Sequence, residues 1–135
     1  MKKSFLLFLV TLLVHFSCKK DSVTPPPEVF QLTDARVGTN DLDLSANASN
    51  INMPVDQPVV ADFSDTLDAT TVSQSFFLLN GNDTIAVQYF YLNGKKSVSI
   101  KPDDSLINST TYQLVINNKL KSLKGKVILM YMNQN

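Results

Sequence analysis

The chain has 135 residues, with 12 lysines and arginines against 12 aspartates and glutamates, so its formal net charge is zero. This balance gives no electrostatic reason to expect nucleic-acid binding. His15 is the one histidine and Cys18 the one cysteine. The sequence after residue 18 therefore excludes an internal disulfide, a Cys/His zinc site and a Ser-His-Asp or Cys-His nucleophile. We expect no enzymatic activity, no cofactor and no metal.

The first 18 residues have the pattern of a bacterial lipoprotein signal peptide. Two lysines are followed by an apolar run of 12 residues at positions 5–16, which is shorter than the roughly 20 residues of a membrane-spanning helix. We predict that residues 1–17 are cleaved and that Cys18 is lipidated, which anchors the chain to the outer membrane in a leaflet that the sequence does not specify. The alternative is an ordinary secretory signal, or a short anchor, in which the cysteine has no role.

A tether and one domain follow the signal. Residues 18–28 hold three consecutive prolines at 25–27, which favour an extended polyproline segment. Residues 29–135 have the length of a single domain.

Charge is unevenly distributed along the chain. Ten acidic residues and one basic residue lie between Asp21 and Asp83, whereas seven lysines follow from Lys95 onward. Because strands that are distant in sequence interleave in space, we expect a mixed surface rather than two ends of opposite sign.

Short alternating or β-branched segments, separated by Asn, Gly, Asp, Pro and Ser, predict an all-β chain. We expect strands over residues 30–37, 42–44, 59–63, 76–79, 84–92, 97–101 and 110–116. A single helical turn is expected near residues 70–72, with Asp68 as its N-cap. Asn-Gly pairs predict turns at residues 80–83 and 93–96. About seven short strands indicate an immunoglobulin-like antiparallel β-sandwich.

The last apolar segment, residues 127–132, predicts either a strand buried on both faces or an exposed edge strand. The sequence stops soon after this segment, so a domain truncated at its C-terminus is an alternative interpretation.

Residues 30–125 resemble the SbsA-type bacterial Ig-like domain of surface-layer and envelope proteins. The resemblance follows the order and spacing of Phe63-Ser64, Leu67-Asp68, Val72, Phe76, Val98, Ile100, Pro102, Leu106, Thr111-Tyr112, Leu114-Val115-Ile116, Leu120, Leu123 and Gly125. It implies a β-sandwich that serves as a spacer, adhesion or interaction module, and it carries over no catalytic residues. The chain departs from the family in lacking the usual Phe-x-Thr-like final strand. The segment Ser-Cys-Lys-Lys-Asp-Ser around Cys18 is similar to lipoproteins of Bacteroidota-type bacteria.

Two groups of carboxylates are considered as candidate metal-binding or catalytic sites. Asp62, Asp65 and Asp68, beside Asp56, could supply oxygen ligands to calcium, but they lack the glycine and glutamate of an EF-hand loop, and we favour plain turns. Asp41 and Asp43 alternate with leucines, as in an edge strand whose carboxylates face water. A glycosidase-like acid pair is the alternative.

Tyr89, Phe90 and Tyr91 form an aromatic triplet. Packing in the core and at its edge is the default interpretation, with at least one ring near solvent. The alternative is contact with a glycan or a protein partner.

Four Asp-Ser or Asp-Thr pairs, each followed by an aliphatic residue, are similar to O-glycosylation signals of Bacteroidota envelope proteins. The acceptors would be Ser22, Thr66, Thr84 and Ser105. Turn formation alone explains the same dipeptides.

Taken together, these patterns predict a membrane-anchored envelope lipoprotein that presents one Ig-like domain as a non-catalytic structural, adhesion or interaction module. One alternative is a glycan-binding lipoprotein of a polysaccharide-uptake system. Another is a fragment of a larger multidomain surface protein or enzyme.

Overall fold

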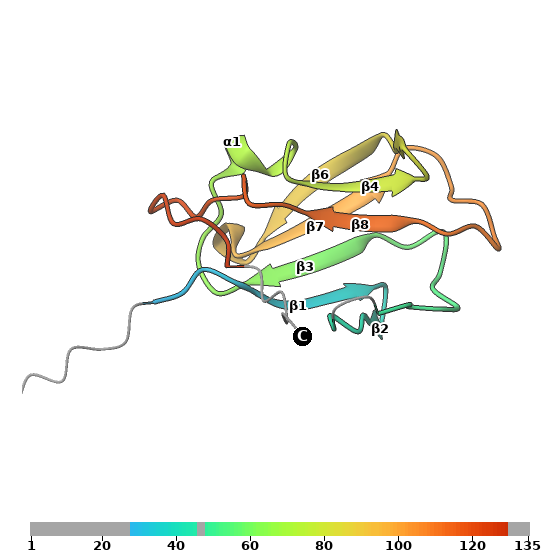
Figure 1. Cartoon of the computed structure of the whole chain (residues 1–135), viewed down its shortest axis with the longest axis horizontal. Helices are drawn as coiled ribbons and strands as arrows, with labels where there is room; N and C mark the ends of the chain where they lie inside the picture. Colours follow the sequence, from blue (N-terminus) through green and yellow to red (C-terminus); the bar gives the residue numbers. More distant parts are fainter. Residues whose placement is uncertain (1–27, 46–47, 130–135) are drawn as a thin grey trace, which may run out of the picture.

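A computed structural model describes residues 28–45 and 48–129 of the chain. The described part is almost entirely strand, turn and loop (Figure 1). Its elements are β1 (Leu32–Val37), β2 (Asn40–Asp41), β3 (Val59–Phe63), α1 (Ala69–Val72), β4 (Phe76–Asn80), β5 (Asp83–Thr84), β6 (Val87–Leu92), the 3-10 turn η1 (Asn93–Lys95), β7 (Ser97–Pro102) and β8 (Gln113–Ile116). Among these residues no helix has the length and apolar character needed to cross a membrane.

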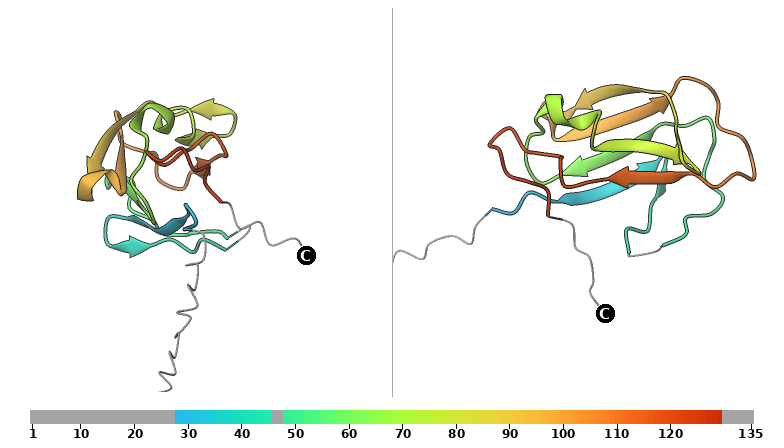
Figure 2. Two further views of the ribbon diagram at one scale, coloured as in Figure 1. Left: turned by 90° about the vertical axis from the view of Figure 1, so that its left-hand side faces the viewer. Right: turned by 45° about the horizontal axis from the view of Figure 1, so that its top comes forward.

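The strands form two antiparallel sheets packed as a sandwich. One sheet has five strands in the order β2-β1-β3-β7-β6, and the other has three in the order β5-β4-β8. Figure 2 shows the two layers from one end and in an oblique view tilted by 45°. The predicted all-β, two-sheet sandwich is therefore confirmed.

The core lies between the two sheets, and alternate residues of the strands point into it. Val59, Ala61 and Phe63 of β3 all point inward, as predicted, and are buried. The Phe63 ring lies 5.8 Å from the Phe30 ring and 6.4 Å from the Phe76 ring, meeting Phe76 edge to face. Residues of one sheet thus contact residues of the other, and this burial of apolar area stabilises the fold.

The predicted single strand over residues 84–92 is wrong. The N–H of Ile85 donates to the carbonyl of Leu78 in β4, whereas the carbonyl of Ala86 accepts from the N–H of Asp103, which follows β7. The chain therefore leaves the three-stranded sheet at Ile85 and joins the five-stranded sheet at Val87. It forms two strands, β5 and β6, in different sheets.

The predicted strand over residues 42–44 is also wrong, because pairing starts earlier. Gly38 has φ +60, a conformation that is unfavourable for residues with a side chain. This turn brings Asn40 opposite Val37 and Asp41 opposite Arg36. Beyond this two-residue strand, the N–H of Leu42 still donates to the carbonyl of Ala35 at 2.8 Å.

Strand β8 is shorter than the predicted 110–116. Ser109 has φ +59, which breaks the extended backbone. The hydroxyl of Tyr112 accepts a hydrogen bond from the N–H of Ile107 at 2.9 Å and so closes residues 107–112 into a loop. Strand pairing with β4 begins only at Gln113.

The C-terminal segment 127–132 is described as far as Leu129. Its Val127 makes one isolated bridge to Lys121, and the N–H of Ile128 donates to Leu120. Ile128 is buried in the core, whereas Val127 and Leu129 are half exposed. Burial on both faces is therefore wrong for the described part of this segment, which buries one face. Residues 130–132 lie outside the described residues.

The single helical turn forms where it was predicted. Asp68 is the N-cap of α1, and its side chain accepts from the N–H of Thr70 at 3.0 Å. This cap satisfies a backbone donor that has no partner within so short a helix.

Candidate functional site

The aromatic triplet in β6 divides between the two faces of its sheet. The hydroxyl of Tyr89 donates to the Phe76 carbonyl at 2.8 Å, and that of Tyr91 donates to the Ala69 carbonyl at 3.3 Å. Both rings pack against the core, and burial raises the pKa of each phenol. Phe90 points outward and is 46% exposed. The strand therefore presents one ring of the three to solvent.

Phe90 belongs to a small apolar area on the outer face of the five-stranded sheet. Leu92 lies two positions along on the same face and is also half exposed. Opposite them on β7 are Ser99 and Ser97, which are nearly buried. β6 is an edge strand of this sheet. The arrangement places two half-exposed apolar side chains beside an unpaired strand edge.

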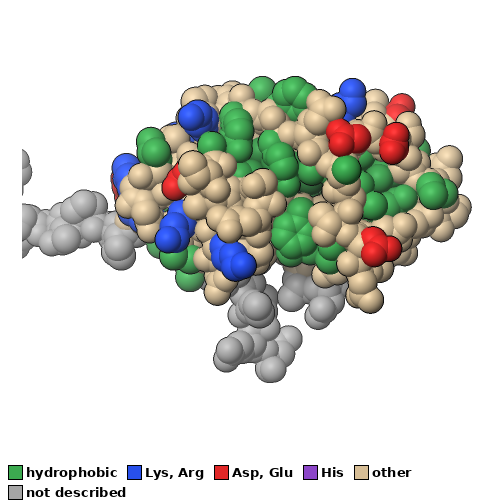
Figure 3. Space-filling view, turned by 90° about the horizontal axis from the view of Figure 1, so that it is seen from above, with side chains coloured by type: hydrophobic (Ala, Val, Ile, Leu, Met, Phe, Trp, Pro, Cys, Tyr) green, Lys and Arg blue, Asp and Glu red, His purple; other side chains and the backbone are tan. Residues whose placement is uncertain are grey.

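The described lysines gather at one end of the sandwich, contrary to the mixed surface that we expected from the sequence. Backbone hydrogen bonds bring three loops together there: Phe63 to Lys96, Leu67 to Lys95 and Asp68 to Lys121. Six of the seven described lysines lie on these loops or just beyond them: Lys95, Lys96, Lys119, Lys121, Lys124 and Lys126. In Figure 3 most basic side chains lie at the left and most acidic side chains at the right. The ends of the sandwich thus differ in sign.

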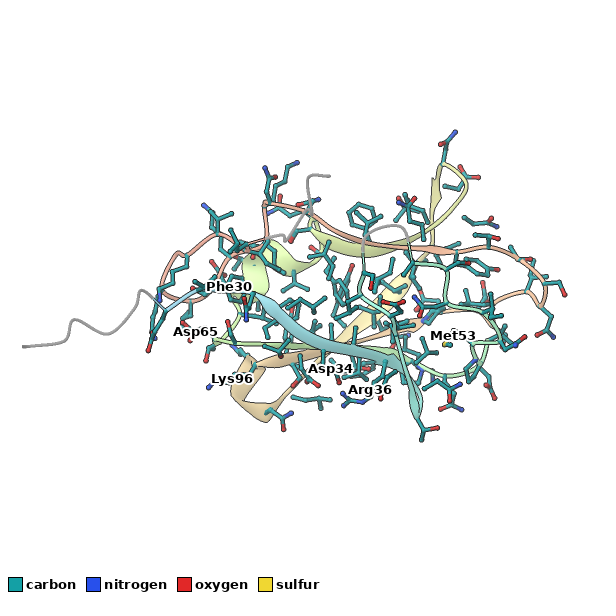
Figure 4. The ribbon with its side chains drawn as sticks, turned by 60° about the horizontal axis from the view of Figure 1, so that its bottom comes forward. Phe30, Asp34, Arg36, Met53, Asp65 and Lys96 are labelled. Atoms are coloured by element: carbon teal, nitrogen blue, oxygen red, sulfur yellow. The ribbon has the colours of Figure 1, made fainter. Side chains whose placement is uncertain are left out.

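The described chain also begins at the lysine-rich end. Lys124 Nζ lies 3.4 Å from Glu28 Oε2 and 3.3 Å from Asp65 Oδ2, and Lys126 Nζ lies 3.4 Å from the same Glu28 oxygen. These lysines lower the pKa of Glu28, and Asp65 raises the pKa of Lys124. Figure 4 labels Asp65 and Lys96 near Phe30, at the end where β1 begins. The ion pairs tie the N-terminal segment to the loop around Gly125.

A shallow hollow of about 300 Å³ lies beside these ion pairs, lined by Glu28, Val29, Ser64, Asp65, Lys96 and Lys124. The hydroxyl of Ser64 donates to the carbonyl of Val29 at 2.7 Å and accepts from the N–H of Gln31 at 3.0 Å. The hydroxyl thus bridges the N-terminal segment to the end of β3. Glu28, Asp65 and Lys124 of this lining compensate one another in ion pairs, whereas Lys96 forms none.

The four aspartates considered as calcium ligands do not form one cluster; each has its own partner or lies in a different part of the sandwich. Asp62 Oδ2 accepts from Arg36 Nη1 at 2.7 Å, and the neighbouring Ser97 hydroxyl, with Arg36, lowers its pKa. Asp65 pairs with Lys124, Asp68 caps α1, and Asp56 lies beside Gly38 at the opposite end. No cluster of three or more His, Cys, Asp or Glu suited to a metal is found in the described part.

Asp41 and Asp43 also differ in their surroundings. Asp41 is exposed in β2. Asp43 Oδ1 accepts from both the hydroxyl and the N–H of Ser45, and these bonds lower the pKa of its carboxyl. This is the geometry of an Asx turn.

The proposed acceptor hydroxyls lie on different loops. Thr84 and Ser105 are exposed, and both lie at the end of the sandwich opposite the lysine-rich loops. Thr66 is half buried, at the lysine-rich end. Ser22 and Cys18 lie outside the described residues.

The lysine-rich end and its ion pairs were missed by sequence reasoning. The excess of lysines after residue 95 was the available signal, but it does not say which loops meet in space. Glu28 and Lys124 are 96 positions apart in sequence, so no local pattern could pair them.

Comparison with known proteins agrees with this architecture. Neither the curated proteins nor the solved structures that were compared include a match to this chain. Residues 41–133 match the family described as the bacterial Ig-like domain. The match spans more than half of the sequence and covers every strand from β3 to β8. The chain therefore belongs to the bacterial Ig-like domain family.

Proposed function

We propose that this chain is a lipoprotein of the cell envelope, anchored through Cys18, that presents one Ig-like domain as a non-catalytic structural, adhesion or interaction module. The anchor would lie in the outer membrane, and the SbsA-type subset of the family in Bacteroidota-type bacteria is the narrower relationship that we propose for it. Residues 1–17 would be removed as the signal, and residues 18–28 would serve as the tether.

One observation carries this proposal: the domain is fastened just where a tether would join it. Glu28 follows the three prolines directly and is held by Lys124 and Lys126. Val29 is held by Ser64. A module that works at the end of an anchored tether needs this point of attachment to be firm, because any pull on the anchor is applied there.

The anchor is tested by expressing the full chain in a bacterium with an outer membrane and feeding the cells a labelled fatty acid. We expect the wild-type chain to take up label and to sediment with membranes, and Cys18→Ser to lose both properties. Ser22→Ala is the matched control and should behave like the wild type. An unlabelled wild-type chain of full length, or a cleaved soluble one, would overturn the proposal. Proteinase treatment of intact cells then assigns the leaflet.

The exposed apolar pair Phe90 and Leu92 supports an interaction role for the module. Glycan binding is the second candidate, and it now depends on Phe90, since Tyr89 and Tyr91 use their hydroxyls inside the domain. Titration with envelope glycans tests it: Phe90→Ala should abolish binding, and Lys101→Gln on the neighbouring strand should not. Unchanged affinity of Phe90→Ala would remove the glycan proposal.

We further propose O-glycosylation at one or more of Ser22, Thr66, Thr84 and Ser105. The exposure of Thr84 and Ser105 supports these two as the better acceptors. Mass spectrometry of tryptic peptides from the native protein should find hexose on at least one of the four. Unmodified peptides covering all four positions would refute this.

A further inference from the structure

The lysine-rich end of the sandwich carries an excess of positive charge. Its six lysines lie near the carboxylates of Glu28, Asp65 and Asp68, whereas Asp62 at the end of β3 is neutralised by Arg36. This leaves an excess of three positive charges. The opposite end holds one lysine, Lys101, against five aspartates: Asp41, Asp56, Asp83, Asp103 and Asp104. The described domain therefore carries net positive charge at one end of its strands and net negative charge at the other.

The two ends are far enough apart to act independently. A strand of six residues such as β7 spans about 20 Å, whereas charges in physiological salt are screened over about 8 Å. A charged surface that meets the lysine-rich end is therefore little affected by the aspartates at the other end, even though residues 18–135 hold 10 basic and 12 acidic residues.

Four of the six lysines are available to a ligand. Lys124 and Lys126 are ion-paired with Glu28 and Asp65. The side chains of the other four form no ion pair or hydrogen bond with a described residue, and all four residues are exposed: Lys95, Lys96, Lys119 and Lys121. They come from two neighbouring loops, which Asp68, Leu67 and Phe63 hold together through backbone hydrogen bonds.

We propose, on the basis of the lipid anchor proposed above, that these four lysines bind the anionic lipid headgroups of the membrane that holds the anchor. Glu28 is ten positions after Cys18, and an extended chain of that length reaches at most about 35 Å. The domain is tethered by the same end that carries the lysines. The lysine-rich loops therefore face the membrane, and the aspartate-rich end points away from it.

Charge complementarity favours a lipid surface over a compact anion. The four lysines are spread over two loops and are not gathered around a buried donor, so they suit many headgroups at once and do not form a pocket for one. Each lysine held at an anionic surface strengthens binding about fivefold. Together the four lysines would strengthen binding more than a hundredfold over a neutral surface.

The test uses the chain from Cys18 to Asn135 carrying Cys18→Ser, which has no lipid and retains every residue of the described core. Its binding is measured by sedimentation with vesicles of phosphatidylcholine alone and of phosphatidylcholine with about one third phosphatidylglycerol. We expect binding to the anionic vesicles only, and its loss at high salt. Replacing Lys95, Lys96, Lys119 and Lys121 with glutamine should weaken binding more than a hundredfold, whereas Lys19→Gln with Lys20→Gln should weaken it less.

A variant with restored net charge distinguishes the effect of where the lysines lie from the effect of the net charge of the chain. It carries the four glutamines together with Asp41→Asn, Asp83→Asn, Asp103→Asn and Asp104→Asn, so its net charge equals that of the parent chain. Binding that stays weak supports the proposal. Binding that recovers, or wild-type binding by the four-glutamine variant, would overturn it.

Because the tested chain has no lipid, the outcome is independent of Cys18 acylation. Thermal unfolding of each variant confirms that it is folded. We expect this because the four replaced lysine side chains form no ion pair or hydrogen bond in the described part.

Discussion

The C-terminal segment offers the sharpest test of how this sandwich is closed. Ile128 is 4% exposed, whereas its neighbours Val127 and Leu129 are 50% and 46% exposed. Ile128 lies in the same core cluster as Leu120, to whose carbonyl its N–H donates at 3.0 Å. Truncating each of the three residues to alanine should therefore destabilise the domain very unequally.

The magnitudes follow from the carbons removed and their burial. Ile128→Ala deletes three carbons from a buried position, which at about 0.8 kcal/mol each gives roughly 2.4 kcal/mol before any cavity term. With the cavity term we expect a loss of about 3 kcal/mol. Leu129→Ala deletes three half-buried carbons and should cost about 1.2 kcal/mol, and Val127→Ala deletes two and should cost about 0.8 kcal/mol.

Urea unfolding of the chain from Cys18 to Asn135, followed by tyrosine fluorescence or circular dichroism, measures these differences. For a domain of about 100 residues, the loss at Ile128 should also lower Tm by more than 10 °C. Equal losses of unfolding free energy at Ile128 and Leu129 would refute the alternation of buried and exposed side chains along this segment. A loss below about 1 kcal/mol at Ile128 would show that the segment is not part of the core.

Three further predictions concern individual contacts. Tyr89→Phe removes the hydroxyl that donates to the Phe76 carbonyl and should cost about 1 kcal/mol in urea unfolding, more than Tyr91→Phe, whose bond is longer; the reverse order would contradict the described geometry. Because the folded chain lowers the pKa of Asp62 below its ordinary 3.8, this carboxylate stabilises the fold above that value and the stabilisation is lost as the pH falls through the folded pKa. Asp62→Asn should therefore flatten the acid side of a stability–pH profile, and an unchanged profile would exclude this role. Asp68→Ala removes the cap of α1 and should lower the urea midpoint of unfolding, whereas Asp68→Asn should retain most of the stability; equal losses would argue against capping.

Several parts of the fold could be predicted because their cause is local. β3 alternates Val59, Ala61 and Phe63 toward the core, and the short side chain of Asp68 caps a helix within two residues of itself. The outward position of Phe90 between two inward tyrosines follows from the same alternation. Each of these features depends on neighbours that are visible in a few residues of sequence.

The change of sheet at Ile85 and Ala86 could not be predicted in this way. Ile85 and Val87 remain in phase with Tyr89 and Tyr91, and all four are partly buried and packed against one core. Because both sheets face the same interior, the apolar pattern continues unbroken while the hydrogen-bonding partner changes from β4 to β7. Periodicity reports which side is buried and not which strand is paired.

The same distinction between local and long-range causes applies to the candidate site. The sequence alone determined that the chain is a β-sandwich with one inward and one outward face on each strand, because burial and turn geometry are encoded by neighbouring residues. Only the tertiary structure decided that the loops around Lys95 and Lys121 meet at the end where Glu28 joins the domain. The position of each loop in space is set by strand order and pairing between distant residues, and the charge at each end of the domain is the sum over loops that only the folded chain brings together.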